Sequence, residues 1–470
     1  MYEVVLQSLG AAETVTGSKH LLKTPELTIL VDCGLFQGIK SIREQNWKSL
    51  RIAASEIDLI ILTHAHLDHC GYIPLLVKNG FKGKIFMTRP TSELTELILL
   101  DSAKLQEEDA EHANEQHFSK HDPAIPLYTV EDARASFDHF ATIEVGIFVR
   151  LSDHIHFRFK TSAHILGACS VELTCFGKTI IFSGDIGRNN SALLPAPDFF
   201  TAADFIVMES TYGDRLHGHT DPYDDLADMI NETIDKRGNV LIPSFAVGRA
   251  QELIYILNTL KIQNRIPYDI PIVLDSPMAA AANKILIRYA NEFTKIHQKE
   301  YEEMSDQIQI NQDYVETIGT ISDKKSKVVI AASGMLTGGR VLSYLKNYLG
   351  DSRNTILIIS FQAEGTRGRA LVNGSHELKI HGKYYGVKAK VVEILGLSAH
   401  ADENELMDWI RKFEVPPQLV MLVHGEPSAQ EAFRVKIQTE LHLPVKIMRQ
   451  HEDVLLFNCS NIAEDLRPAE

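Results

Sequence analysis

Three histidines and one aspartate fall within six residues, between an apolar run at 59–62 and an amphipathic segment at 73–77. They are His64, His66, Asp68 and His69. Imidazole nitrogens and carboxylate oxygens are ligands that zinc prefers, so this stretch predicts a metal site. His64 and His66, two apart at a predicted strand end, point one way, whereas Asp68 and His69 begin a helix and point another. One ion would hardly need all four donors, which favours two metal ions.

Each of these residues, taken singly, has an ordinary structural explanation. Asp68 is a good N-cap for the following helix, and histidines do occur by chance in turns between a strand and a helix. Four such residues in so short a stretch are much harder to explain by chance. We therefore favour the metal site.

Six further polar donors stand at comparable places along the chain. All but one follow an apolar predicted strand, and the exception, His164, lies in a glycine-bounded loop before a strand. The six are Asp32, His164, Asp185, Glu209, His400 and His424. Each alone is explained by turn chemistry. Because α/β sheets gather their sites at strand ends, the repeated pattern predicts that these residues share one site.

Composition and charge limit the classes of function. The chain has 470 residues, of which 44% are hydrophobic and 23% charged, which is typical of a globular protein of about two domains. The net charge of -15 argues against a general electrostatic grip on nucleic acid. Two divalent ions would outweigh their ligand carboxylates, so an acidic protein of this kind could still attract phosphate locally.

The cysteines and the apolar runs predict where the protein resides. The five cysteines are scattered and never form C-x-x-C, so we expect neither disulfides nor a cysteine zinc site. The N-terminus lacks the features of a signal peptide, and no apolar run approaches eighteen residues. We expect a cytoplasmic protein that does not enter a membrane.

The elements that must position these residues alternate between strands and helices. From 211 to 390, four apolar strands each lead into a loop of small residues and then a helix or turn, which predicts a parallel sheet covered by helices. We therefore expect an α/β protein with one domain of residues 1–210 and 391–470, and an inserted cap domain of residues 211–390.

The loops of the expected cap contain groups that suit phosphate binding. Backbone N–H groups, hydroxyls and guanidinium groups bind phosphate well where a loop opens a helix. Glycine and serine are also what tight turns need, so the two explanations carry about equal weight. The candidate phosphate contacts are Ser244, Arg249, Ser333, Arg340 and Arg367.

Taken together, these residues resemble a known family. His64-x-His66-x-Asp68-His69, with Asp32, His164 and Asp185, resembles the first four motifs of the metallo-β-lactamase superfamily. Glu209, His400 and His424 resemble three motifs of its β-CASP branch of nucleic-acid-processing nucleases. The resemblance implies an αββα sandwich with an inserted β-CASP cap.

The resemblance also implies two zinc ions per chain. Asp185 would bridge them, and Asp32 would orient a ligand imidazole without touching zinc. One ion would be bound by His64, His66, His164 and Asp185, and the other by Asp68, His69, Asp185 and His424.

The function that this resemblance implies is hydrolysis of single-stranded RNA by an endonuclease. A histidine at 424 resembles the RNA-processing members of the family. Hydroxide on zinc would attack the phosphodiester, and His400, paired with Glu209, would protonate the leaving 3′-oxygen. Asp68 would help to orient the nucleophile. We expect products with a 5′-phosphate and a 3′-hydroxyl.

Several alternatives stay open. A 5′-to-3′ exoribonuclease is one, a DNA nuclease is another, and the sequence leaves open whether the chain forms a homodimer. A small-molecule hydrolase on the same core is less favoured. A small substrate does not need a cap of about 180 residues, which is the size of a whole domain. A metal-free RNA-binding scaffold is disfavoured because every ligand position is filled.

Overall fold

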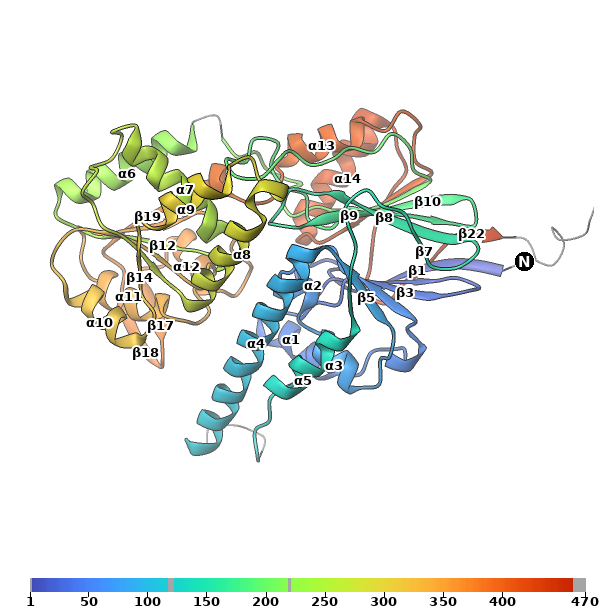
Figure 1. Ribbon diagram of the computed structural model, residues 1–470, viewed down its shortest axis with the longest axis horizontal. Coiled ribbons are helices and arrows are strands. Elements are labelled where there is room, and N and C mark those ends of the chain that lie inside the picture. Colours follow the sequence, from blue (N-terminus) through green and yellow to red (C-terminus); the bar gives the residue numbers. More distant parts are fainter. Residues whose placement is uncertain (1, 117–121, 219–220, 460–470) are drawn as a thin grey trace, which may run out of the picture.

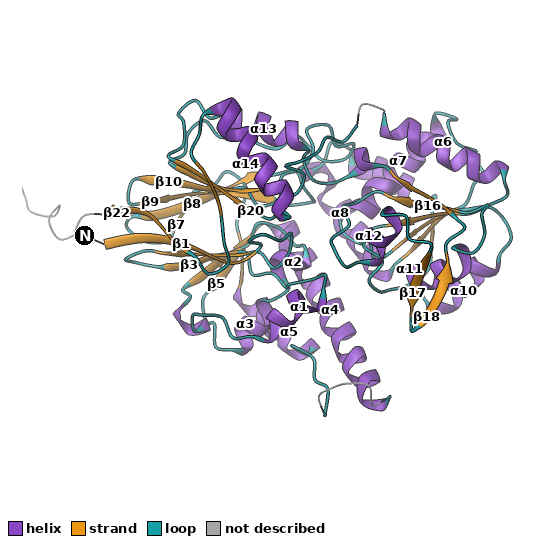
Figure 2. Cartoon of the chain, turned by 180° about the vertical axis from the view of Figure 1, so that it is seen from behind, coloured by secondary structure: helices purple, strands orange, loops and turns teal. Residues whose placement is uncertain are grey.

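Two stacked sheets and one separate sheet organise the molecule. The computed structural model describes residues 2–116, 122–218 and 221–459. Two seven-stranded sheets lie face to face at one end, and a six-stranded sheet forms the other end (Figure 1). Helices cover the outer faces of the stacked pair (Figure 2). The expected αββα sandwich with an inserted cap is confirmed.

The first stacked sheet combines the start of the chain with its last strand. Its three antiparallel pairs give way to parallel pairing from β3 onward. In spatial order its strands are β22 (Asp453–Cys459), β1 (Tyr2–Gly10), β2 (Lys19–Lys23), β3 (Thr28–Val31), β4 (Leu59–Ile61), β5 (Lys84–Met87) and β6 (Phe140–Thr142).

The second stacked sheet is built in the same manner. Its antiparallel strands lie at one side, and β10, β11, β20 and β21 run parallel. In spatial order its strands are β21 (Val445–Ile447), β20 (Leu419–Val423), β11 (Phe205–Glu209), β10 (Lys178–Phe182), β9 (Cys169–Cys175), β8 (Ile155–Thr161) and β7 (Val149–Arg150).

Apolar side chains from both sheets fill the space between them. Phe157, Phe159 and Phe205 of one sheet and Leu6 and Val31 of the other belong to one buried cluster. Their alternation along the strands puts every second residue into this layer, as a half-buried strand requires. The stacked pair is therefore a rigid base, and its parallel strands bring their carboxyl ends, where the polar donors follow, to one edge.

Helices cover the outer faces of the two stacked sheets. The first sheet is covered mainly by a long helix and its neighbours, and the second by two helices near the C-terminus. These are α2 (Leu67–Cys70), α3 (Ile73–Lys78), α4 (Arg89–Glu115), α5 (Val130–Ser136), α13 (Glu403–Arg411) and α14 (Pro427–Leu441), with the short α1 (Lys40–Arg43) beside them.

The third sheet is entirely parallel. Its strands, in spatial order, are β14 (Gln309–Ile310), β13 (Ile272–Asp275), β15 (Val328–Ala331), β12 (Val240–Pro243), β16 (Thr355–Ile358) and β19 (Lys390–Glu393). Strands β12, β13, β15 and β16 begin the four units that the sequence predicts. A hairpin of β17 (Glu377–Ile380) and β18 (Lys383–Gly386) lies outside the sheet.

Helices pack on both faces of this third sheet. One face carries α6 (Pro222–Asp235), α7 (Arg249–Ile262), α8 (Pro277–Phe293) and α9 (Gln298–Ser305). The other face carries α10 (Tyr314–Ser322), α11 (Val341–Tyr348) and α12 (Arg367–Val372). Strand β19 crosses the expected domain limit at 390/391 and pairs with β16, and we propose that the cap extends through it. Among the described residues, no helix is both long and apolar enough to cross a membrane.

Candidate active site

Asp32 supports the loop that follows β4. It follows β3 directly with a φ of 61°, and its carboxylate accepts hydrogen bonds from the backbone N–H of Thr63 at 2.8 Å and from the Thr63 hydroxyl at 3.0 Å. The Nδ1 atom of His69 lies 2.7 Å from the same carboxylate. With Nδ1 donating to Asp32, the Nε2 atom of His69 is directed into the site as a free electron-pair donor.

Four ligand atoms converge beside this loop. His64, His66, His164 and Asp185 each offer one atom, and all lie within 4.8 Å of one another. The Nε2 atoms of His64 and His164 lie 3.2 and 3.1 Å from Nδ1 of His66, and both lie 3.4 Å from Oδ2 of Asp185. Corners of a tetrahedron with zinc bonds of about 2.0–2.1 Å are about 3.3 Å apart, so this spacing fits a zinc ion.

A second group of donors lies next to the first. Asp68, His69 and His424 also offer atoms within 4.8 Å of one another. The Nε2 atom of His424 lies 3.4 Å from Asp68, and Nε2 of His69 lies 3.3 Å from Oδ1 of Asp185. In the described part of the chain, Nε2 of His69 and Oδ1 of Asp185 have no hydrogen-bond partner. Buried polar atoms normally have partners, so these atoms fit a bridged pair of cations.

The charge state of the first group suits a divalent cation. Burial lowers the pKa of His66 to about 4 and holds the pKa values of His64 and His164 well below the usual value. Neutral imidazole is the form that binds metal. Burial opposes ionisation of Asp185, but the surrounding imidazoles, that of His424 first, lower its pKa well below the usual value. The group therefore offers neutral nitrogens and an ionised oxygen.

His69 stands apart from the other histidines in its charge balance. Burial disfavours its protonated form, yet the carboxylates of Asp185 and Asp32 raise its pKa well above the usual value. The two carboxylates thus create a negative electrostatic potential around this imidazole. The same potential would stabilise a bound divalent cation.

Glu209 and His400 form a pair at the edge of the cluster. Glu209 is the last residue of β11, is buried, and its Oε2 lies 3.1 Å from Nδ1 of His400. The opposite nitrogen of His400, Nε2, lies 4.0 Å from Oδ2 of Asp185. Burial lowers the pKa of His400, but the carboxylates of Glu209, Asp185 and Asp68 together outweigh burial and raise the pKa above the usual value. These carboxylates therefore favour the protonated form of His400.

Two loops of the cap approach the cluster from the opposite side. The ring of Phe245, next to the buried Ser244, lies 6.0 Å from the ring of His66. Gly334, next to Ser333, packs so closely that a Cβ there would lie 2.9 Å from the backbone nitrogen of Phe245. Two of the expected phosphate contacts are thus near the cluster, although the Ser333 hydroxyl bonds within its own loop.

The three candidate arginines use their guanidinium groups within the protein. Arg249 is buried and donates to the Leu397 carbonyl. Arg340 donates to the buried carboxylate of Asp275 and to backbone carbonyls. Arg367 donates to three backbone carbonyls of the cap. Phosphate binding by these side chains stays a prediction.

The structure adds residues that the sequence did not single out. The Oγ1 atom of Thr211 lies 3.1 Å from Nδ1 of His424, as Asp32 lies beside His69. Arg188 donates to the Gly396 carbonyl near His400. Thr211 lies two residues after Glu209 and Arg188 three after Asp185, so proximity to the motifs was the signal available.

Three family descriptions match successive parts of the chain. Residues 21–207 match a metallo-beta-lactamase superfamily domain, residues 250–371 a Beta-Casp domain, and residues 384–448 a Zn-dependent metallo-hydrolase RNA specificity domain. The first region contains six of the expected ligand residues, and the third contains His400 and His424.

Named relatives cover most of the chain. This chain is 34% identical to Ribonuclease TTHA0252 of Thermus thermophilus over 428 residues. The aligned region covers 89% of this chain and 92% of the relative. The chain is 31% identical over 449 residues to an RNase J-like protein of Methanocaldococcus jannaschii, covering 94% and 97%. Transcription termination factor FttA of the same archaeon is 31% identical, covering 91% of this chain and 68% of that protein.

A solved structure shares the fold. A protein of unknown function from Enterococcus faecalis superposes with a TM-score of 0.52 at 11% identity, over 96% of this chain and all of the other. At that identity the likeness concerns the fold alone.

Proposed function

The chain belongs to the metallo-β-lactamase superfamily, in its β-CASP branch, and from that premise we propose that it is a ribonuclease that cleaves single-stranded RNA internally. It is a metal-dependent hydrolase of this family. The names of two relatives and the RNA specificity domain that matches residues 384–448 support RNA as the substrate. A histidine at position 424 supports RNA over DNA on the family resemblance.

One observation carries the proposal. The His400 imidazole lies against the cluster of ligand atoms, with Nδ1 3.1 Å from Glu209 and Nε2 4.0 Å from Asp185. A hydrolase that splits a phosphodiester needs a proton for the leaving oxygen at such a place. The carboxylate of Glu209 favours the imidazolium, so His400 suits a general acid.

Two zinc ions, when bound, would supply positive charge to the phosphate and a water molecule acidified to near-neutral pH. His64, His66, His164 and Asp185 would hold one ion, and Asp68, His69, Asp185 and His424 the other. Asp32 fixes the ring of His69, and Thr211 that of His424. Asp68 additionally orients the attacking water through its carboxylate.

The reaction is a direct displacement at phosphorus. The water releases one proton to solvent, its oxygen forms the new bond to phosphorus, and the bond between phosphorus and the 3′-oxygen breaks. His400 gives its Nε2 proton to that 3′-oxygen, which leaves as a hydroxyl. Glu209 stays ionised and holds the imidazole in place. The products carry a 5′-phosphate and a 3′-hydroxyl.

Analysis of the product ends tests this scheme. Purified protein loaded with zinc is incubated with an unstructured RNA, and the ends are mapped by phosphatase and ligase sensitivity. We expect 5′-phosphate and 3′-hydroxyl ends. A 2′,3′-cyclic phosphate would show attack by the RNA's own 2′-hydroxyl and would overturn the scheme. A matched DNA strand, cleaved equally well, would overturn the preference for RNA.

A time course separates internal cleavage from processing at an end. RNAs with a 5′-hydroxyl and with a 5′-phosphate, labelled along the whole strand, are followed from the first per cent of reaction. Internal cleavage gives fragments of several lengths at once, regardless of the 5′ group. Mononucleotides released in order from the 5′ end would instead identify a 5′-to-3′ exonuclease.

A further inference from the structure

The start of helix α7 packs closely against a loop of the site. Gly248, which precedes the helix, has a φ of 87°, and a Cβ there would lie 2.5 Å from the side chain of Ile165. Ile165 directly follows His164 in the sequence. Only glycine permits this backbone and this contact, so the first residue of α7, Arg249, is held at the boundary between the domains.

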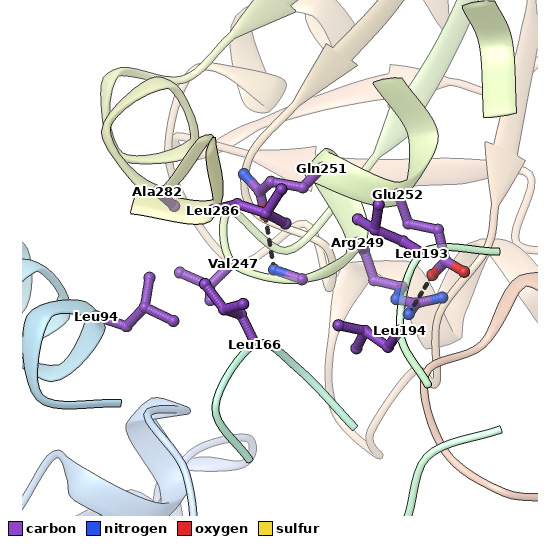
Figure 3. A pocket seen from close by; sticks show the side chains of 11 residues that line it. Leu94, Leu166, Leu193, Leu194, Val247, Arg249, Gln251, Glu252, Ala282 and Leu286 are labelled. Carbon is purple, nitrogen blue, oxygen red and sulfur yellow. Dashed lines mark hydrogen bonds and ion pairs between the residues drawn. The ribbon is translucent and has the colours of Figure 1, made fainter. Parts of the chain in front are cut away.

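Arg249 reaches across that boundary. Its Nη1 atom donates to the backbone carbonyl of Leu397 at 2.7 Å, and its Nη2 atom forms an ion pair with Glu252 one turn along the helix (Figure 3). Glu252 in turn accepts hydrogen bonds from the hydroxyl of Ser191 at 3.0 Å and the backbone N–H of Ala192 at 3.2 Å. The pair thus bridges one cap helix to two loops of the metallo-β-lactamase domain.

The surroundings leave no room for substrate at this guanidinium. Arg249 is 6% exposed and Glu252 7%. The cavity beside them has a volume of about 10 Å³ and is lined largely by leucines, among them Leu166, Leu193 and Leu194 (Figure 3). A cavity of that size takes about one water molecule and no phosphate group. The contacts of Arg249 therefore point to a role within the protein.

A second arginine holds the same segment from the other domain. Arg188, three residues after Asp185, donates from Nη1 to the carbonyl of Gly396 at 3.0 Å and pairs with Glu405 at 2.6 Å. Two consecutive carbonyls, those of Gly396 and Leu397, are thus each held by an arginine. Three residues after Leu397 the chain reaches His400.

The rest of this segment is held by a backbone group of the metallo-β-lactamase domain and by a side chain of the loop that leads into α6. The N–H of Ala401 donates to the carbonyl of Ile186 at 2.8 Å, and Nε2 of His217 lies 3.0 Å from the carbonyl of His400. The contact made by Arg249 differs from the others. Arg249 is the first residue of α7, the second helix of the cap, and so belongs to the core of the cap. A shift of the cap would therefore be transmitted to the His400 segment through Arg249.

We propose that Arg249, oriented by Glu252, is a positioning residue that makes the placement of the His400 imidazole depend on correct seating of the cap. This rests on the proposed function, in which His400 protonates the leaving oxygen. Without the guanidinium, the buried Leu397 carbonyl loses its donor and the Glu252 carboxylate is left unpaired in an apolar setting. The segment then relaxes, and His400 moves away from the leaving oxygen while the metal ligands stay in place.

A change of leaving group tests this directly. Activity is measured on RNA and on the p-nitrophenyl ester of uridine 5′-monophosphate, whose leaving group departs as a stable anion and needs no proton. For Arg249→Met in the zinc-loaded protein we expect kcat on RNA to fall by about 10²-fold, a typical contribution of acid catalysis. We expect kcat on the ester to fall less than about 5-fold, with KM for RNA and zinc content unchanged, because binding and Lewis-acid chemistry stay intact.

Three further variants complete the design. Arg249→Lys keeps one cationic donor and should recover part of the activity on RNA, and Glu252→Gln, which keeps the shape of the side chain, should lose activity selectively on RNA. Lys295→Met is the matched control, because Lys295 donates from the cap to the Ser191 carbonyl at 3.0 Å without touching the His400 segment. The activities of this variant on the two substrates should change in equal proportion. If Arg249→Met fails to fold, the other two variants decide.

The outcomes separate this proposal from the function beneath it. Equal losses on both substrates in the Arg249 and Glu252 variants would overturn the positioning role, as would a raised KM for RNA with normal kcat, which would identify a phosphate contact. His400→Ala is the reference. If it too loses both activities equally, the acid role of His400 fails, whereas a selective loss in His400→Ala alone rejects only the role of Arg249.

Discussion

The metal-ligand cluster and the segment that carries His400 are neighbours, with 4.0 Å between Oδ2 of Asp185 and Nε2 of His400, but they are held in different ways. Asp32 follows β3 and Thr211 follows β11, so the side chains that orient His69 and His424 both stand at strand ends of the stacked sheets. The His400 segment is held by arginines from both domains. The difference indicates that the ligand cluster depends on one domain, whereas the acid depends on how two domains meet.

Asp185→Asn should have the largest effect, because both oxygens of Asp185 face ligand groups. Losing this charge from the centre of the cluster should reduce zinc to below one ion per chain and lower kcat on RNA by about 10³-fold or more, since several kcal/mol of charge stabilisation are lost. Zinc analysis of dialysed protein, with assays on RNA, gives the measurement. Retention of two zinc ions would contradict a bridging role.

His400→Ala should separate the two regions. The proton donor is lost but no ligand is, so we expect unchanged zinc content and a decrease in kcat on RNA of about 10²- to 10⁴-fold. Zinc analysis and kinetics on the same preparation check both statements. Loss of zinc together with activity would mean that His400 belongs to the cluster and that the comparison fails.

Asp32→Asn should lower the zinc affinity of the cluster, because Asp32 orients His69, and should leave His400 unaffected. The amide can still accept from Thr63 but no longer supplies a charge to Nδ1 of His69. Residues in this position typically change metal affinity by about 10- to 100-fold. Titration with a zinc chelator gives the affinity, and activity at saturating zinc should recover. Failure to recover would show that Asp32 acts beyond ligand orientation.

Lys19→Met should give the smallest effect and reports on the backbone under the cluster. Lys19 is 1% exposed and donates to the Gly17 and Gly34 carbonyls. Burial lowers its pKa to about 8 from 10.5 in the unfolded chain. Between these values the unfolded chain binds more protons, so the Lys19 contribution to stability rises with pH.

The measurement for Lys19 is urea unfolding of both proteins at two pH values. Relative to Lys19→Met, the wild type should gain about 2 kcal/mol in free energy of unfolding between pH 7 and pH 9.5. The ratio of kcat on RNA to kcat on the nitrophenyl ester should not change, because Lys19 touches neither His400 nor the cap. A difference in stability that is constant with pH would show that Lys19 has an ordinary pKa in the folded protein.

Much of the fold could be predicted from apolar runs. The four predicted strands of the cap correspond to β12, β13, β15 and β16. Runs of buried residues carry that signal. The short edge strand β14 and the hairpin of β17 and β18 were missed, because two to four residues of mixed polarity give no periodicity. Glu209 was expected after its strand but is its last residue.

The residues of the site also include some that the sequence could identify and some that it could not. His64, His66, Asp68 and His69 are close in the sequence, so their residue types and spacing already indicate a metal site. Arg249 is the opposite case. Arginine is usually exposed, and nothing local marks one that is buried and bonded to a carbonyl 148 residues away. The sequence made it a candidate phosphate contact, with a tight-turn explanation of about equal weight, because its loop has the composition of a phosphate-binding turn.

The sequence by itself determined the donors and the order of strands that carry them, because ligand chemistry follows residue type and strand formation follows local apolar pattern. Only the tertiary structure decided which donors share a metal centre and which arginine side chains bond to groups within the protein. The reason is physical: the partner of a buried hydrogen bond is set by how separate layers close against each other. At Gly396 and Leu397 that closure brings two distant arginines to adjacent carbonyls, three residues before His400.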